Sequence, residues 1–179
     1  MKRRTIPWLA ALAAVVLASP LAGQSLGPSA RKPAADGFAG AGEYSFTAIR
    51  QDMSLHLSLS EDRGTLFAAL EAPTTGWVAV GLGSLRMDGA FMVLGFDAAG
   101  QVSVREDTGV GRRHSPNPER RLTAQAVRES AGRTTLEIAL PAAPFISGAG
   151  LRLILAYGRG DNFTSMHASY AQIEVPLAR

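Results

Sequence analysis

Short apolar runs separated by turn sequences are the feature that most constrains the fold of this chain. Between Met53 and Ser60, apolar residues alternate with serine and histidine, which is the pattern of a half-buried β-strand. Turn sequences such as Asp62-Arg63-Gly64 and Ser130-Ala131-Gly132 divide the chain into further runs of similar length. No stretch combines the length and the 3.6-residue period of a long amphipathic helix.

About ten such runs are present, and strands at this spacing are typical of antiparallel sheets joined by hairpins. They span residues 44–50, 53–60, 65–71, 76–82, 90–96, 102–106, 122–129, 134–140, 151–157 and 172–177. We therefore predict an all-β fold, an antiparallel, immunoglobulin-like β-sandwich of about ten strands.

Residues 1–23 have the composition of a secretory signal peptide. Basic residues at 2–4 precede an apolar run at 6–17, and Pro20 interrupts this run before it reaches the roughly 20 residues that a membrane span needs. Gln24 stands where a lipoprotein signal would carry its lipidated cysteine. We expect a periplasmic or secreted protein with no membrane anchor after signal cleavage.

The rest of the chain divides into a leader and one domain. Residues 24–42 are rich in glycine, alanine, proline and serine, a composition that predicts a mobile leader. Residues 43–179 are enough for one domain with a core of ordinary size.

Composition excludes several classes of function. The chain has 18 basic and 15 acidic residues, and the basic residues at 2–4 account for the whole excess. The mature protein is therefore neutral, which argues against a nucleic-acid partner. The chain has no cysteine, which excludes disulfides, thiolate metal sites, iron–sulfur clusters and covalently attached haem. Any haem would be held non-covalently, as haem b.

The three histidines lie in different contexts. His56 is on the serine side of an alternating strand, and His114 is in a proline-containing loop, so we expect both to be exposed. His167 follows a polar loop and precedes the last strand, where a sandwich presents its loops. His167 is the strongest candidate for a functional role.

Four segments carry a resemblance to a known family. They are Gly76-Trp77-Val78-Ala79-Val80-Gly81-Leu82-Gly83, Met87-Asp88-Gly89-Ala90-Phe91-Met92-Val93, Leu153-Ile154-Leu155-Ala156-Tyr157-Gly158, and the polar loop through Asp161 with His167. From Tyr44 to the C-terminus the chain resembles the DOMON family of β-sandwich domains, one branch of which binds haem b. Phe91 departs from this pattern, since relatives carry an aspartate there.

The resemblance implies that Met87 and His167 are the axial ligands of a haem b iron. Methionine–histidine ligation raises the reduction potential of the iron. Both residues would reach over one open end of the sandwich. Met92 is expected to fill the core, whereas Met166 stays open as an alternative to Met87.

The resemblance also suggests which residues surround the cofactor. Phe91, Tyr157, Phe163 and Tyr170 flank the ligands in sequence and are expected to line the pocket. Trp77 is either a core aromatic or part of the cofactor site. Arg86 and Arg159 are candidates to pair with the haem propionates, although both would also suit an ordinary surface.

The predicted function is an exported electron-transfer domain that exchanges electrons with a separate redox partner, such as a membrane cytochrome. The alternative is a carbohydrate- or small-ligand-binding module of the same fold, without haem. Enzymatic activity is not expected, because the sequence has no nucleophile elbow, zinc-type histidine pair or spaced pair of catalytic carboxylates.

Overall fold

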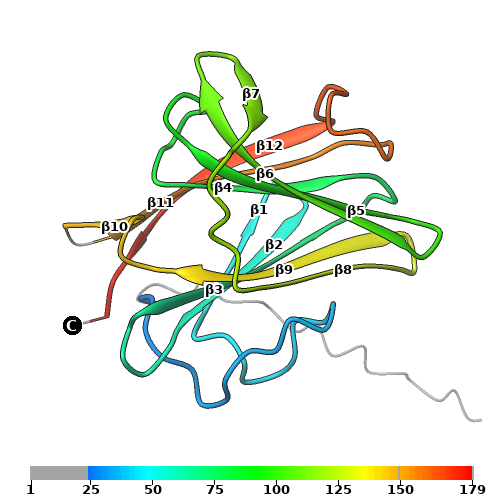
Figure 1. Cartoon of the computed structure of the whole chain (residues 1–179). Helices are drawn as coiled ribbons and strands as arrows, with labels where there is room; N and C mark the ends of the chain where they lie inside the picture. The colour runs from blue at the N-terminus through cyan, green and yellow to red at the C-terminus, as the bar shows by residue number, and fades with distance from the viewer. Residues whose placement is uncertain (1–23, 149, 179) are drawn as a thin grey trace, which may run out of the picture.

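The computed structural model describes residues 24–148 and 150–178, so the predicted signal peptide at 1–23 lies outside the described residues. Within these ranges the chain forms twelve strands and no helix, and hence no helix that could cross a membrane. Every strand pairing is antiparallel, and the strands form two facing sheets (Figure 1). This confirms the predicted antiparallel β-sandwich.

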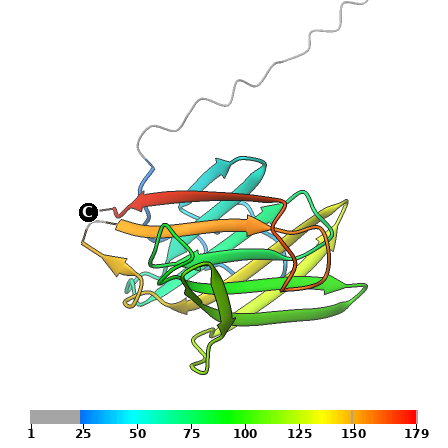
Figure 2. The same ribbon diagram turned by 90° about the horizontal axis from the view of Figure 1, so that it is seen from above.

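One sheet has five strands, in the order β1-β2-β3-β9-β8. Its strands are β1 (Phe46–Arg50), β2 (Met53–Leu59), β3 (Thr65–Ala72), β8 (Ala124–Ser130) and β9 (Arg133–Pro141). The other sheet has seven strands, in the order β10-β11-β4-β5-β6-β7, with β12 also paired to β11 (Figure 2). Its strands are β4 (Val78–Leu82), β5 (Phe91–Ala98), β6 (Gln101–Val110), β7 (Arg113–Pro116), β10 (Ile146–Ser147), β11 (Gly150–Tyr157) and β12 (Ser169–Pro176).

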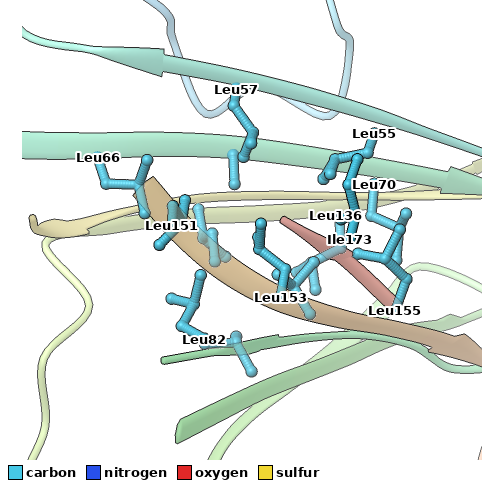
Figure 3. Packing of buried hydrophobic residues seen from close by; sticks show 14 of the residues in the cluster. Leu55, Leu57, Leu66, Leu70, Leu82, Leu136, Leu151, Leu153, Leu155 and Ile173 are labelled. Carbon is cyan, nitrogen blue, oxygen red and sulfur yellow. The ribbon is translucent and has the colours of Figure 1, made fainter. Parts of the chain in front are cut away.

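The main core lies between the two sheets and is dominated by leucine. Inward-facing leucines alternate with outward-facing residues along β2 and β11, and Figure 3 shows leucines of both sheets pointing toward one another. Full burial of a leucine side chain contributes about 1.5–3 kcal/mol. This core explains how a chain without cysteine holds the sandwich together.

A strand stands where the sequence predicted a loop. Val110 and Arg113 pair across a tight turn, so β7 adds an edge strand to β6. Gly111 has a φ of 62°, a conformation that glycine adopts without strain. The turn places His114 directly opposite Gly109 of β6.

Residues 24–42 form no regular strand, but they pack against the domain (Figure 1). Leu26 is fully buried and bridges to Leu177. The Glu137 carboxylate accepts the backbone N–H groups of residues 36–38 at 2.7–3.1 Å and the hydroxyl of Tyr44 at 2.6 Å. The composition that predicted a mobile leader gives no sign of these contacts, because the acceptor lies about a hundred residues away in the sequence.

Candidate functional site

A second apolar cluster covers the outer face of the seven-stranded sheet. Its buried members are Trp77, Ala79, Ala90, Met92 and Leu94, and Met87, Phe96, Ile154, Ala156 and Phe163 pack against them partly buried. The strands β4 and β5 are thus apolar on both faces, although a two-layer sandwich usually presents polar residues outward. The loops at 83–90 and 158–168 contribute some of the residues in this apolar cluster.

Along β4, the residues in the middle of this face have small side chains or none. Ala79 and Gly81 point outward there, since Val78, Val80 and Leu82 face the main core. The register places Gly81 between Met92 and Ile154. A Cβ on Gly81 would lie 2.4 Å from Cγ1 of Ile154, so only glycine fits this position.

The loop that carries Met87 is held against the backbone of β6. The Gly89 N–H donates to the Gly109 carbonyl at 3.1 Å, and the Gly109 N–H donates to the Ala90 carbonyl at 2.9 Å. A Cβ on Gly109 would lie 1.8 Å from the Met87 carbonyl oxygen. The Met87 loop therefore packs directly against the backbone of Gly109, where any side chain would clash. This contact brings the half-buried Met87 side chain to the apolar cluster.

The loop that carries His167 is tied down by Trp77. The Trp77 Nε1–H donates to Ser165 Oγ at 2.8 Å, and the indole lies so close to Gly158 that a Cβ there would be 2.1 Å from Nε1. The Ala168 N–H donates to the Tyr157 carbonyl at 2.7 Å. These contacts fix both sides of His167, so Trp77 positions the loop as well as packing in the cluster.

Aromatic contacts extend this loop over the apolar face. Phe163 lies 4.7 Å from the ring of Phe96, and the Arg105 guanidinium lies 4.7 Å from the centre of the Phe163 ring. His167 is half-buried, with its ring 5.0 Å from that of Tyr170. His167 therefore lies beside β12, at the end of the loop that Figure 2 shows in orange.

Met87 and His167 approach the apolar face from different directions. Met87 rests on Gly109 of β6, beyond the end of β4, whereas His167 lies beside Tyr170 of β12, near the start of β4. The strands β11, β4 and β5 lie between β12 and β6. The expectation of a single open end of the sandwich is thus corrected: the two residues flank an outer face diagonally.

Two residues expected in the pocket lie on the other side of the sheet. Phe91 packs in the main core, 5.3 Å from the ring of Phe145. Tyr157 also belongs to that core, and its hydroxyl donates to Asp52 at 2.6 Å, which together with burial raises the pKa of Tyr157. The structure does not bring Phe91 and Tyr157 to the face that Met87 and His167 border.

The remaining predicted residues lie on or near this face. Arg86 and Arg159 are exposed on the loops that carry Met87 and His167. Met92 is buried in the outer cluster instead of the main core, and Met166 is 82% exposed. Met87 packs against this cluster partly buried, whereas Met92 is buried within it.

A polar triad beside the apolar cluster escaped the sequence analysis. Asp107 is fully buried, and its carboxylate accepts two hydrogen bonds from Arg105, each 2.7 Å long, and one from Nδ1 of His114 at 2.5 Å. Asp107 pairs with Met92, which places the triad on the same outer face. The expectation that His114 and His56 are exposed was wrong, since both are half-buried. For His114, the Arg-x-Asp spacing in a strand before a glycine turn was the available signal.

Shallow hollows lie at two places on the described part of the chain, and the second borders the Met87 loop at Gly83, Gly89 and Ala90. One, of about 310 Å³, lies over β11 and β12, where Arg152 and Glu174 form an exposed ion pair of 2.8 Å. The other, of about 280 Å³, is lined by Phe91, Arg121 and Phe145, among others. Neither is lined by Met87 or His167, so we locate the site by its donor atoms and not by its volume.

Comparison with known proteins supports the fold. Neither a family model nor a curated protein sequence matches the chain. The cytochrome b domain of pyranose dehydrogenase from Coprinopsis cinerea matches with a TM-score of 0.61 and 14% identity, over 74% of this chain and 81% of that one. The cytochrome domain of cellobiose dehydrogenase from Myriococcum thermophilum matches with a TM-score of 0.56 and 11% identity, over the same shares. The chain therefore has the β-sandwich fold of these cytochrome domains.

Proposed function

We propose that this chain is an exported, DOMON-type electron-transfer domain that binds haem b through Met87 and His167. One observation carries the proposal: a half-buried thioether and a half-buried imidazole, on two separately anchored loops, flank an apolar outer face. An apolar face of this kind is unusual in a two-layer sandwich and is expected where a ligand covers it.

The residues on this face fit the chemistry of haem b. Thioether and imidazole are a known axial pair for haem iron, and the chain has no cysteine for covalent attachment. The side chains of Met92 and Ile154 cover Gly81, so the ring would rest on the apolar cluster itself. Arg86 and Arg159, exposed on the two loops, are suited to pair with the propionates.

The chain's own contribution would be to hold both axial positions of the iron and to keep water away from the ring. Haem supplies reversible one-electron transfer when it is bound. Met87 and His167 would hold the iron from its two sides and so leave an outside molecule no position to bind, which suits electron transfer and not oxygen activation. The Trp77–Ser165 hydrogen bond would keep the His167 loop in place.

The proposed partner is a separate redox protein, such as a membrane cytochrome, in the periplasm or outside the cell. An apolar face flanked by aromatic residues would also suit a sugar or another small ligand, because Tyr170 is 64% exposed beside His167. The two functions differ in a measurable way, since only the first requires that the protein take up haem.

The test is a haem titration of the mature protein, followed by visible spectra of the oxidised and reduced forms. We expect a six-coordinate low-spin spectrum with the signature of methionine–histidine ligation, and this signature should be lost in Met87→Ala and in His167→Ala. Met166→Ala is the matched control, since Met166 is 82% exposed, and it should leave the spectrum unchanged. A protein that takes up no haem would overturn the proposal and favour the sugar-binding alternative.

A further inference from the structure

The Asp107 triad leaves one histidine nitrogen free. Arg105 donates to both carboxylate oxygens of Asp107, and Nδ1 of His114 donates to Oδ2. With the proton on Nδ1, the neutral imidazole carries its lone pair on Nε2. Within residues 24–148 and 150–178, Nε2 of His114 forms no hydrogen bond.

The register places this imidazole beside Met87. His114 and Gly109 are directly paired in β6 and β7, and paired residues point to the same face of a sheet. Met87 rests on Gly109, where an added Cβ would lie 3.2 Å from Cγ of Met87. His114 and Met87 therefore stand together on the β6 side of the apolar face, whereas His167 stands on the β12 side.

We propose that His114 is a second ligand for the iron on the Met87 side, able to replace the thioether through Nε2. The inference rests on the proposed haem function. With haem bound, Nε2 of His114 would take the place of the Met87 thioether on the iron, so that one Fe–S bond would be exchanged for one Fe–N bond; a neutral His114 with its proton on Nδ1 would release no proton. The domain would thus hold haem through either methionine–histidine or bis-histidine ligation.

The hydrogen bond to Asp107 is the second argument for this role. Histidines that bind metals almost always donate their other ring N–H to a carboxylate or carbonyl, which fixes the tautomer and makes the free nitrogen more basic. Asp107 is fully buried and is neutralised by Arg105, so it holds the ring of His114 firmly.

The decisive experiment compares Met87→Ala with the double variant Met87→Ala/His114→Gln, each loaded with haem. We expect the single variant to remain low-spin with the spectrum of bis-histidine ligation. The double variant should turn high-spin and bind haem at least about tenfold more weakly. Met87→Ala/His56→Gln is the matched control, because His56 lies in the other sheet, and it should behave like Met87→Ala.

A high-spin Met87→Ala that matches the double variant would overturn this inference while leaving the haem function intact. A wild-type protein that takes up no haem would overturn both. Nitrogen NMR of the haem-free protein gives an independent reading, because the inference requires His114 to carry its proton on Nδ1. A proton on Nε2 instead would refute it, and circular dichroism would confirm that each variant is folded.

Discussion

Replacing Ser165 by alanine tests the link between Trp77 and the His167 loop. The change removes the acceptor of the Trp77 Nε1–H, and this indole is only 5% exposed, so its N–H is left without a partner. A buried polar group that loses its partner costs about 1–3 kcal/mol. For a domain of about 150 residues, this cost lowers the melting temperature by roughly 2–12 °C.

The assay uses the protein's own tryptophan. Trp8 lies in the predicted signal peptide, so Trp77 is the one tryptophan of the mature sequence, and its fluorescence reports both urea unfolding and haem uptake. Haem affinity should fall by about tenfold if the loosened loop costs 1.4 kcal/mol. Ser165→Thr keeps a hydroxyl and should restore both properties.

Thr164→Ala is the matched control for this prediction. Thr164 is the neighbouring residue, and its hydroxyl bonds to the Asn162 side chain within the loop and not to Trp77. The variant should unfold at the same urea concentration as the wild type. The reasoning is refuted if Ser165→Ala unfolds and binds haem like the wild type, or if Thr164→Ala is equally affected.

Three further predictions concern other parts of the molecule. Gly109→Ala should displace Met87 and abolish methionine ligation, because its Cβ would lie 1.8 Å from the Met87 carbonyl; Gly160→Ala, with no heavy atom near its added Cβ, should have no effect on the haem spectrum. Glu137→Gln should lower the free energy of unfolding by about 1–3 kcal/mol and expose the leader to proteolysis, since it weakens three backbone hydrogen bonds; an unchanged urea midpoint would contradict this. Burial lowers the pKa of His56 in the folded protein. As the pH falls through about 6.5, the unfolded chain therefore binds the proton first, and the free energy of unfolding decreases. Urea melts of His56→Gln should show a smaller decrease in the free energy of unfolding over the same pH range.

The sequence by itself determined the strands and most of the core, because both depend on local periodicity. The alternation at 53–60 appears in the structure as β2, with its leucines buried in the main core. Met87 and His167 were also singled out from the sequence, since their flanking glycines and polar loops form local patterns, and their role as ligands stays a prediction. These features depend on residues only a few positions apart.

Only the tertiary structure decided which face each side chain occupies. The run at 90–96 is apolar at nearly every position, so periodicity did not distinguish Phe91, which faces the main core, from Met92, which faces outward. A strand buried on both faces has no polar side to mark its orientation.

Long-range pairing decided the rest. The leader packs against the domain because its backbone N–H groups donate to Glu137, about a hundred residues away in the sequence. His114 is held because the β6–β7 turn brings it back to Asp107. The carboxylates that bind these segments are buried, and a buried acceptor must find donors wherever the fold brings them. Such donors are neighbours in space and not in sequence, so they cannot be predicted from composition or from spacing along the chain.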